Sequence, residues 1–397
     1  MWRNTRLKFC QRETKNTNNS PLQLPQGGET GTLRCLSLST FVEMEGAIYI
    51  FSTMEIIIGL LIIAIGAFCQ SSCYVPINKI KDWSWESYWL VQGVFAWIAF
   101  PLLGALLAVP EGHSLAELFA SSSSFNIWMT VLFGALWGVG GLTFGLSMRY
   151  LGVALGQSIA LGTCAGLGTI MGPVLLNIFF PEEDALSKLT FAVILGVAVT
   201  LLGIAIIGVA GSMKSASLSE EEKKAAVKDF NFPKGLAIAL LAGFMSGCFN
   251  VGLEFGKDIN FGDLTPNMYK TLPATLLVTL GGFCTNAVYC FFQNSKNNTW
   301  ADYKKGNVWL NNLLFCALAG GLWYSQFFGL SLGKGFLTAS ETLMTLSFCI
   351  LMALNVVFSN VWGIILKEWK GCSQKTIAVL VLGIIVLIVS SFLPQLI

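Results

Sequence analysis

Charged side chains and histidine are scarce in this sequence. Of the 397 residues, 12% are charged, whereas an average soluble domain has about 25%. His113 is the only histidine, so the chain cannot build a histidine-based metal site or catalytic dyad. We therefore expect no metal and no cofactor. The net charge of +2 says nothing about partners, and nothing in the sequence supports nucleic-acid binding.

A phosphate-binding loop is also missing. The chain has 41 glycines, but no Gly-Lys-Ser/Thr element follows any of them, which excludes a nucleotide-binding loop of that kind. Many glycines instead form GxxxG pairs within apolar runs, at 134/138, 141/145, 152/156, 162/166 and 168/172. Such spacing can bring helix backbones close together in lipid.

Long apolar runs fill most of the sequence. Hydrophobic residues make up 54% of the chain, and the mean hydropathy is +0.67. Because about 20 consecutive apolar residues can span a bilayer as a helix, we predict an all-α polytopic membrane protein with ten spans. These spans are expected at 56–76, 88–109, 127–148, 153–177, 189–211, 235–255, 271–292, 309–331, 337–362 and 376–393.

An internal repeat is visible within the ten spans. The tetrapeptide FGLS occurs at 144–147 and at 328–331, and each copy closes a span that begins with FGAL or FCAL. When the two FGLS copies are aligned, Gln157 falls opposite Glu341. The longest polar connection divides the spans into five and five, so the second copy must enter the membrane from the opposite side. This pattern is typical of secondary transporters built from inverted repeats.

The repeat and the polar connection define the expected domains. We predict a first five-helix repeat at 54–213, a linker at 214–234 with a short capped helix from Ser219, and a second repeat at 235–397. Residues 1–53 lack a signal peptide and helical periodicity, so we expect a disordered extension or a mis-assigned start.

Lysine and arginine are unevenly divided between the two sets of loops. Loops after the odd-numbered spans carry 14 of them, and loops after the even-numbered spans carry 4. By the positive-inside rule the odd-numbered loops are cytoplasmic, and both ends of the bundle then lie outside. In the first loop, the aromatic residues Trp83, Trp85, Tyr88 and Trp89 are expected in the headgroup layer.

Several short motifs in order resemble a known family. They are YVPINKIKDWSWE at 74–86, MRYLG at 148–152, GGLWYSQFF at 320–328 and LKEW at 366–369. Together they resemble the L-rhamnose-proton symporter family of the drug/metabolite transporter superfamily, from about residue 56 to the C-terminus. The stretch 343–366 departs from the family pattern. The resemblance implies import of L-rhamnose, or a related deoxyhexose, together with protons.

The candidate sugar site lies in the eighth span. A pyranose needs an aromatic face for its C–H side and amides or hydroxyls for its own hydroxyl groups. Trp323, Tyr324 and Gln326 supply this combination within one turn, and Asn250 and Gln157 are further candidate ligands. The alternative is that the two aromatic residues belong to a membrane-interface belt.

Glu341 is the candidate for proton coupling. It lies near the start of the ninth span in LTASETLM, where a carboxylate could take up a proton outside and release it inside. A helix-end cap or simple polar packing would explain it equally well.

The expected protein is a secondary active transporter in the cell inner membrane. It is not expected to be an enzyme, and its partners are a small sugar, protons and the lipid bilayer. An exporter or exchanger of other small metabolites remains the alternative, and the sequence leaves the exact sugar and the oligomeric state open.

Overall fold

The structure is a computed structural model, which describes residues 38–151, 153–217, 231–365 and 369–393. The chain forms two compact units, Met1–Tyr49 and Ile50–Ile397, and the account below concerns the second. The described residues form helices, turns and loops, with no strand among them. The predicted all-α class is therefore confirmed. Most of the expected extension and the linker helix from Ser219 lie outside the described residues.

Ten helical segments in the described part of the chain are long and apolar enough to cross a membrane, which confirms the predicted number of spans. The helices that contain them are α2 (Leu38–Ser72), α4 (Trp85–Val94) with α5 (Phe100–Leu106), α7 (Ser124–Leu151), α8 (Val153–Phe179), α9 (Phe191–Ala216), α11 (Phe232–Phe255), α12 (Leu272–Asn297), α13 (Gly306–Phe336), α14 (Glu341–Ile365) and α15 (Gln374–Phe392). Short helices α3 (Tyr74–Ile77) and α6 (Leu115–Ser121) lie in the connections.

The position of the first membrane span agrees with the prediction, although the helix that contains it starts earlier. Helix α2 begins at Leu38, within the expected extension, but its apolar segment begins at Thr53. This is close to the predicted start at residue 56.

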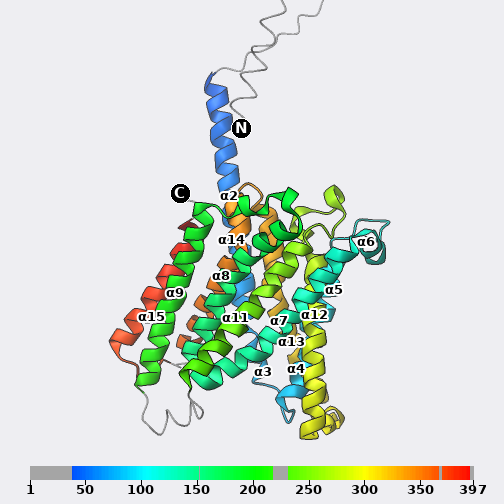
Figure 1. Ribbon diagram of the computed structural model, residues 1–397, viewed down its shortest axis with the longest axis vertical. Helices are drawn as coiled ribbons and strands as arrows, with labels where there is room; N and C mark the ends of the chain where they lie inside the picture. Colours follow the sequence, from blue (N-terminus) through cyan, green and yellow to red (C-terminus); the bar gives the residue numbers. More distant parts are fainter. Residues whose placement is uncertain (1–37, 152, 218–230, 366–368, 394–397) are drawn as a thin grey trace, which may run out of the picture. The chain divides into compact units, whose positions relative to one another are not determined.

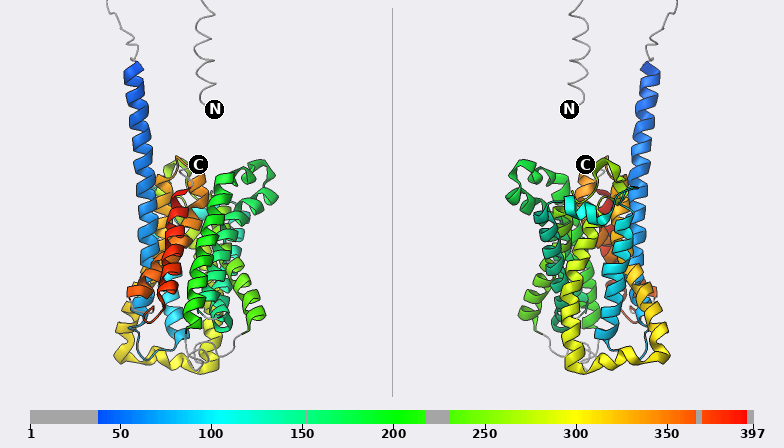
Figure 2. Two further views of the ribbon diagram at one scale, coloured as in Figure 1. Left: turned by 90° about the vertical axis from the view of Figure 1, so that its left-hand side faces the viewer. Right: turned by 90° about the vertical axis from the view of Figure 1, so that its right-hand side faces the viewer.

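Small residues let the helices of the bundle approach closely. Helix α11 packs against α7 and α8, α12 packs against α7, and α9 pairs with α15 beside them, as Figures 1 and 2 show. A Cβ atom added to Gly134 of α7 would lie 2.1 Å from the backbone carbonyl oxygen of Val278 in α12. At Gly66 of α2 it would lie 2.7 Å from the carbonyl oxygen of Ser325 in α13. Such backbone contact is possible only without side chains.

The largest buried cluster lies where these helices meet. Phe249, Phe348 and Leu343 are each at most 1% exposed and belong to one contiguous cluster. Trp137 and Trp323 pack against this cluster but remain partly exposed. The interior of the bundle therefore presents aromatic faces that are not fully covered.

Candidate functional site

The second span is interrupted where it reaches this aromatic region. Between α4 and α5, residues Phe95–Ala99 form a π-helical turn, closed by a bond from the Phe100 N–H to the Phe95 carbonyl oxygen. Pro101 follows directly, and its missing N–H cannot bond the Trp97 carbonyl oxygen one turn earlier. Wide turns of this kind insert one extra residue and occur often at functional sites. Here the turn contains Trp97.

Three indole rings from three different spans meet at this turn. The ring centroids of Trp97 and Trp323 are 5.8 Å apart, and those of Trp97 and Trp137 are 5.9 Å apart, both edge to face. Trp137 and Trp323 are 5.6 Å apart with their planes tilted by 35°. Edge-to-face contacts at these distances are favourable for aromatic rings. We call these three residues the indole cluster.

Two phenylalanines close one side of the indole cluster. The rings of Phe249 in α11 and Phe327 in α13 stack with centroids 3.8 Å apart. Phe249 also contacts Trp137 edge to face at 5.2 Å, and Phe327 contacts Trp323 at 5.3 Å. The result is a rigid aromatic surface in the middle of four spans.

A pair of amides lies one turn from Trp323. The Asn355 Nδ2 donates to the Gln326 Oε1 at 2.9 Å, and the Gln326 Nε2 donates to the Trp323 carbonyl oxygen at 3.2 Å. Both side chains are buried, at 3% exposure for Gln326 and 6% for Asn355. The Ser71 hydroxyl donates to the Asn355 carbonyl oxygen at 3.2 Å. This pair joins α2, α13 and α14 beside the aromatic surface.

Hydrogen-bonding capacity remains free around the indole cluster. Among the described residues, the Trp97 Nε1, the Asn355 Oδ1 and the Gln92 Oε1 are buried without a hydrogen-bond partner. Buried polar atoms are paired in the great majority of cases. One donor and two acceptors without partners are what a site for a polyhydroxylated ligand would contain.

The predicted residues of the eighth span take different directions. Trp323 belongs to the indole cluster, and Gln326 belongs to the neighbouring amide pair. Tyr324 is 6% exposed and lies against α5, where a Cβ atom added to Gly104 would be 2.0 Å from its hydroxyl. The structure therefore brings Trp323 and Gln326 together and turns Tyr324 toward a different helix.

Of the other three candidates, Asn250 and Glu341 have different surroundings. Asn250 donates from its Nδ2 to the Gly168 carbonyl oxygen at 2.8 Å, and its Oδ1 has no partner among the described residues. The side chain of Gln157 lies outside the described residues. Glu341 is exposed and is the first residue of α14, fourteen positions before Asn355, which is about 21 Å along a helix.

Trp97, Trp137 and Asn355 were not predicted from the sequence. A weak signal could have found Trp137, because the third span contains GALW at 134–137 and the eighth contains GGLW at 320–323, although these segments are two residues out of the register that the FGLS copies set. Both tryptophans of this matched pair belong to the indole cluster. Nothing comparable in the sequence marks Trp97 or Asn355.

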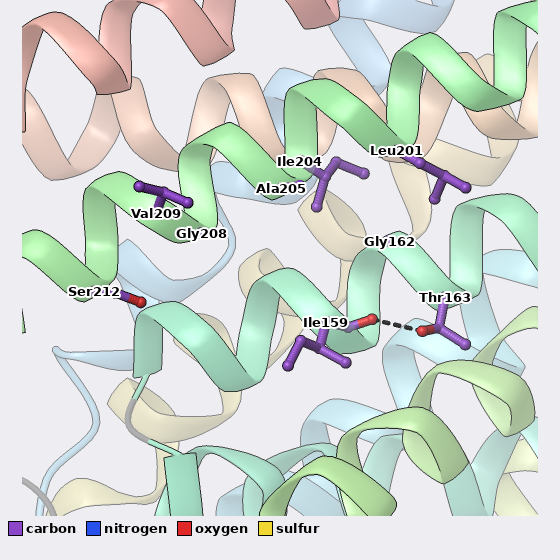
Figure 3. A pocket seen from close by; sticks show the side chains of 9 residues that line it. All are labelled: Ile159, Gly162, Thr163, Leu201, Ile204, Ala205, Gly208, Val209 and Ser212. Atoms are coloured by element: carbon purple, nitrogen blue, oxygen red, sulfur yellow. Dashed lines mark hydrogen bonds between the residues drawn. The ribbon is translucent and has the colours of Figure 1, made fainter. Parts of the chain in front are cut away.

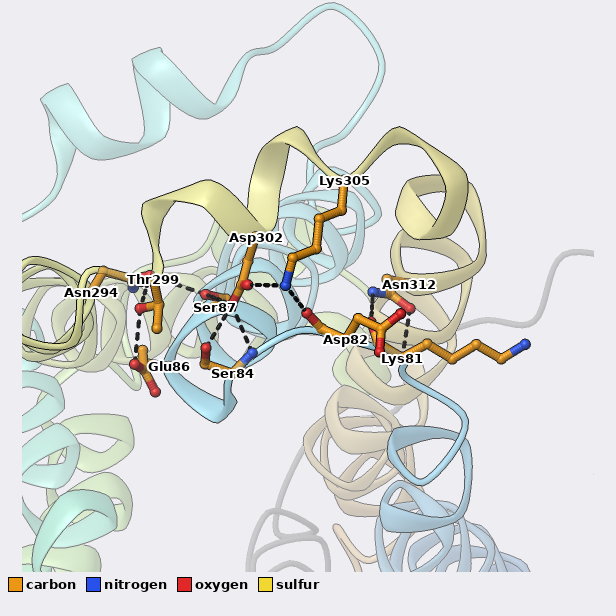
Figure 4. Close-up of polar contacts among 10 residues, drawn as sticks. All are labelled: Lys81, Asp82, Ser84, Glu86, Ser87, Asn294, Thr299, Asp302, Lys305 and Asn312. Atoms are coloured by element: carbon orange, nitrogen blue, oxygen red, sulfur yellow. Dashed lines mark hydrogen bonds and ion pairs between the residues drawn. The ribbon is translucent and has the colours of Figure 1, made fainter.

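A second polar region joins the first loop to the connection between α12 and α13 (Figure 4). Asp302, in the 3-10 helix Thr299–Lys304, accepts hydrogen bonds from the Ser84 N–H at 2.7 Å, the Ser84 hydroxyl at 2.6 Å and the Ser87 hydroxyl at 3.0 Å. Its other oxygen contacts the Lys305 Nζ at 2.6 Å. Ser84 is the N-cap of α4 and makes no side-chain cap of its own. The carboxylate of Asp302 thus caps α4 from another part of the chain.

These contacts keep Asp302 ionised. Burial alone raises the pKa of its carboxyl group, but the hydrogen bonds from Lys305, Ser84 and Ser87 outweigh burial and lower the pKa to about 2. A carboxylate that accepts several hydrogen bonds behaves in this way.

Further bonds extend this loop network on both sides. Glu86 is 1% exposed, and its Oε1 accepts from the Asn297 Nδ2 and the Thr299 hydroxyl, each at 2.9 Å. The Asn312 side chain bonds both the N–H and the carbonyl oxygen of Lys81, at 3.0 and 2.7 Å. We call the contacts of Asp302, Glu86 and Asn312 the loop network.

Two cavities lie elsewhere in the described part. One of about 330 Å³ lies between α8 and α9 (Figure 3). Its lining is mostly apolar, and the hydroxyl of Thr163 already donates to the Ile159 carbonyl oxygen at 2.7 Å. It offers little to a sugar.

The second cavity measures about 620 Å³ and lies between α4, α7 and α12. Four of its lining residues are aromatic: Trp85, Tyr88, Trp89 and Tyr289. Trp89 also contacts Trp97 edge to face at 5.6 Å. One indole therefore borders both this cavity and the indole cluster.

Comparison with known proteins identifies the family of the chain. The family model described as L-rhamnose-proton symport protein (RhaT) matches residues 52–396. A protein named L-rhamnose-proton symporter from Yersinia pestis (strain Pestoides F) is 32% identical over 348 residues, covering 85% of this chain and 96% of that protein. One of the same name from Yersinia pseudotuberculosis serotype O:1b (strain IP 31758) gives the same values. The chain therefore belongs to the L-rhamnose-proton symport protein family.

Proposed function

We propose that this protein imports L-rhamnose together with protons. The observation that carries the proposal is the family match, which extends over residues 52–396 and so includes all ten spans. Relatives that bear the name L-rhamnose-proton symporter align over almost their whole length. The alternative sequence-based prediction, an exporter or exchanger of other metabolites, is not favoured by this family.

The sugar site is proposed at the indole cluster and the amide pair. L-rhamnose carries a methyl group in place of the hydroxymethyl group of ordinary hexoses, so it combines an apolar edge with several hydroxyls. Trp137 and Trp323 offer partly exposed aromatic faces, and the Asn355 Oδ1 and Trp97 Nε1 offer an acceptor and a donor without partners among the described residues. Few, well-placed polar groups on an apolar lining are typical of small-molecule sites.

The other residues predicted from the sequence are proposed to contribute less to sugar binding. Asn250 follows Phe249 of the aromatic surface and has an unpartnered Oδ1 among the described residues. The Tyr324 hydroxyl is likewise buried without a partner among the described residues, and Gln157 is retained from the sequence pattern alone. We expect substitutions at these positions to affect sugar affinity less than substitutions at Trp323.

Transport is proposed to occur by alternating access between two inverted repeats, 54–213 and 235–397, joined by the linker 214–234. The two FGLS copies support the repeat. So do two similar contacts, in which glycines of α7 approach α11 and glycines of α13 approach α2: Gly140 lies against Ser246, and Gly329 lies against Ile62. The excess of lysine and arginine in the odd-numbered loops supports an inner-membrane orientation with both bundle ends outside.

Proton coupling is proposed at Glu341, as the sequence suggests. An exposed carboxylate at the start of α14 can exchange protons with water on the side where that helix begins. The substitution Glu341→Gln should abolish accumulation of the sugar against its gradient and leave downhill exchange intact. If the variant still accumulates sugar under an imposed pH gradient, another group couples the proton.

The decisive experiment is uptake of labelled L-rhamnose into vesicles. An imposed pH gradient, acidic outside, should drive accumulation, and dissipating the gradient should stop it. Competition by fucose, mannose and lyxose defines the specificity. Absence of gradient-driven uptake, with efflux instead, would support the exporter.

A further inference from the structure

Asn286 occupies a position that links three helices next to the indole cluster. It lies in α12 and is 3% exposed. Its Oδ1 accepts a hydrogen bond from the Trp89 Nε1 of α4 at 3.1 Å. Its Nδ2 donates to the Gly282 carbonyl oxygen at 2.9 Å and reaches the Gly138 carbonyl oxygen of α7 at 3.4 Å. Both ends of this amide therefore have partners inside the protein, whereas the Oδ1 atoms of Asn355 and Asn250 have none among the described residues.

The contact continues from Asn286 through Trp89 to the indole cluster. Trp89 meets Trp97 edge to face at 5.6 Å with an interplanar angle of 72°. Trp97 in turn contacts both other rings of the cluster. Since an edge-to-face contact depends on the orientation of both rings, the rotamer of Trp89 bears directly on that of Trp97.

Glycines of α4 and α12, two of the three helices that Asn286 links, leave room for the indoles. A Cβ atom added to Gly93 of α4 would lie 2.7 Å from the Trp97 ring. A Cβ atom added to Gly282 of α12, the residue whose carbonyl oxygen Asn286 bonds, would lie 2.1 Å from the Trp137 ring. Two rings of the cluster thus lie directly on the backbones that Asn286 ties together.

We propose that Asn286 is a positioning residue, which sets the orientation of the indole cluster and thereby the affinity for the sugar without contacting the sugar. The proposal rests on the proposed sugar site. When the amide is removed, the Trp89 Nε1 loses its hydrogen bond to Asn286 and the indole can rotate. This changes the edge-to-face contact that Trp89 makes with Trp97.

A purely structural role for Asn286 makes a different prediction. If the residue only held α4, α7 and α12 together, its loss would reduce the amount of folded protein and the maximal rate. A positioning role instead raises the half-saturation concentration for L-rhamnose at a nearly constant maximal rate per folded molecule.

Asn294 provides a matched control on the same helix. It is 0% exposed, its Nδ2 donates to the Cys290 carbonyl oxygen at 2.9 Å, and its Oδ1 lies 3.0 Å from the hydroxyls of Ser87 in α4 and of Thr299. The Ser87 hydroxyl is shared with Asp302. Asn294 therefore links α12 to α4 as Asn286 does, but its partners are hydroxyl groups instead of an indole. Asn294→Ala removes a comparable amide away from the indole cluster.

The experiment measures uptake of labelled L-rhamnose by Asn286→Ala, Trp89→Phe, the double variant and Asn294→Ala, each normalised to folded protein. We expect Asn286→Ala and Trp89→Phe each to raise the half-saturation concentration about tenfold, the size of one net hydrogen bond. The double variant should resemble either single variant, because both remove the same bond. Asn294→Ala should change the half-saturation concentration less than about twofold.

Two results would overturn the proposal: equal effects of Asn286→Ala and Asn294→Ala on half-saturation, or independent, multiplying effects of Asn286→Ala and Trp89→Phe. Should Asn286→Ala fail to fold, Trp89→Phe tests the same bond by itself, and an unchanged half-saturation concentration there refutes the proposal. Trp97→Ala and Trp323→Ala distinguish failure of the proposed sugar site from failure of the positioning role alone. If neither changes affinity, the proposed sugar site fails; if both do and Asn286→Ala does not, only the positioning role fails.

Discussion

The indole cluster and the loop network both join early and late parts of the chain, but they use polar groups in opposite ways. In the loop network, Asp302 accepts from three groups on α4 and its cap, and Glu86 accepts from two on the opposite connection. At the indole cluster, the Trp97 Nε1 and the Asn355 Oδ1 have no partner among the described residues. Satisfied buried groups stabilise one arrangement, whereas buried groups without partners are uncommon and are groups that a bound ligand could satisfy.

The largest effect on stability is expected from the loop network. Asp302→Ala removes the acceptor of three hydrogen bonds from Ser84 and Ser87, so it should lower the free energy of unfolding by about 3 kcal/mol. The ion pair with Lys305 adds little, because that side chain is 41% exposed. Thermal unfolding in detergent measures this loss. The affinity of the remaining folded protein for L-rhamnose should not change. A variant with normal stability and weakened affinity would reverse the roles of the two regions.

At the indole cluster the expected pattern is the opposite. Trp323→Ala should raise the half-saturation concentration for L-rhamnose at least about tenfold, because the sugar loses an aromatic face. Trp323→Phe retains a face and should lose less. Uptake kinetics and thermal unfolding of the same preparations separate affinity from stability. Unchanged affinity in the alanine variant would instead favour the interface-belt interpretation of this residue.

A smaller effect, about fivefold, is expected for Asn355→Leu, which keeps the volume but removes the free oxygen. A sugar that lacks the hydroxyl bound by Asn355 should be transported poorly by the unmodified protein. The variant should treat that analogue and L-rhamnose alike. Competition assays with a series of monodeoxy analogues test this, and full discrimination retained by the variant would exclude Asn355 from the site.

A further prediction concerns acid stability. The pKa of Asp302 in the folded protein, about 2, lies below its ordinary value of 3.8, so its contribution to stability is present above pH 3.8 and is lost as the pH falls toward 2. Unfolding in detergent as a function of pH should show this loss in the unmodified protein. Asp302→Asn should show a weaker dependence over the same range, and an identical dependence would contradict the assignment.

The membrane spans were predictable because their signal is local. Twenty apolar residues in sequence are sufficient to indicate a span, and all ten predicted spans correspond to described helices. The closeness of Trp323 to Gln326 could also be predicted, because both lie within one turn of the same helix. The proximity of Gln326 to Asn355 depends on how α13 packs against α14, which hydropathy does not specify.

The tryptophans of the first loop also show what the sequence alone could not predict. Its aromatic residues were expected together in the headgroup layer, yet Trp85 is 43% exposed while Trp83 is 9% exposed and packs with Val308. Trp89 contacts the indole cluster through Trp97. Composition predicts an interface, but only the positions of α12 and α13 distinguish an anchor from a buried contact.

Four tryptophans, Trp89, Trp97, Trp137 and Trp323, form a continuous series of ring contacts with centroids 5.6–5.9 Å apart. At such separations the electronic transitions of neighbouring indoles couple, and excitation passes readily from one ring to the next. The near-ultraviolet circular dichroism of the protein should therefore contain a strong coupled signal from this series. A sugar that changes the angle between any two rings would alter that signal, so the protein carries an intrinsic optical reporter of occupancy.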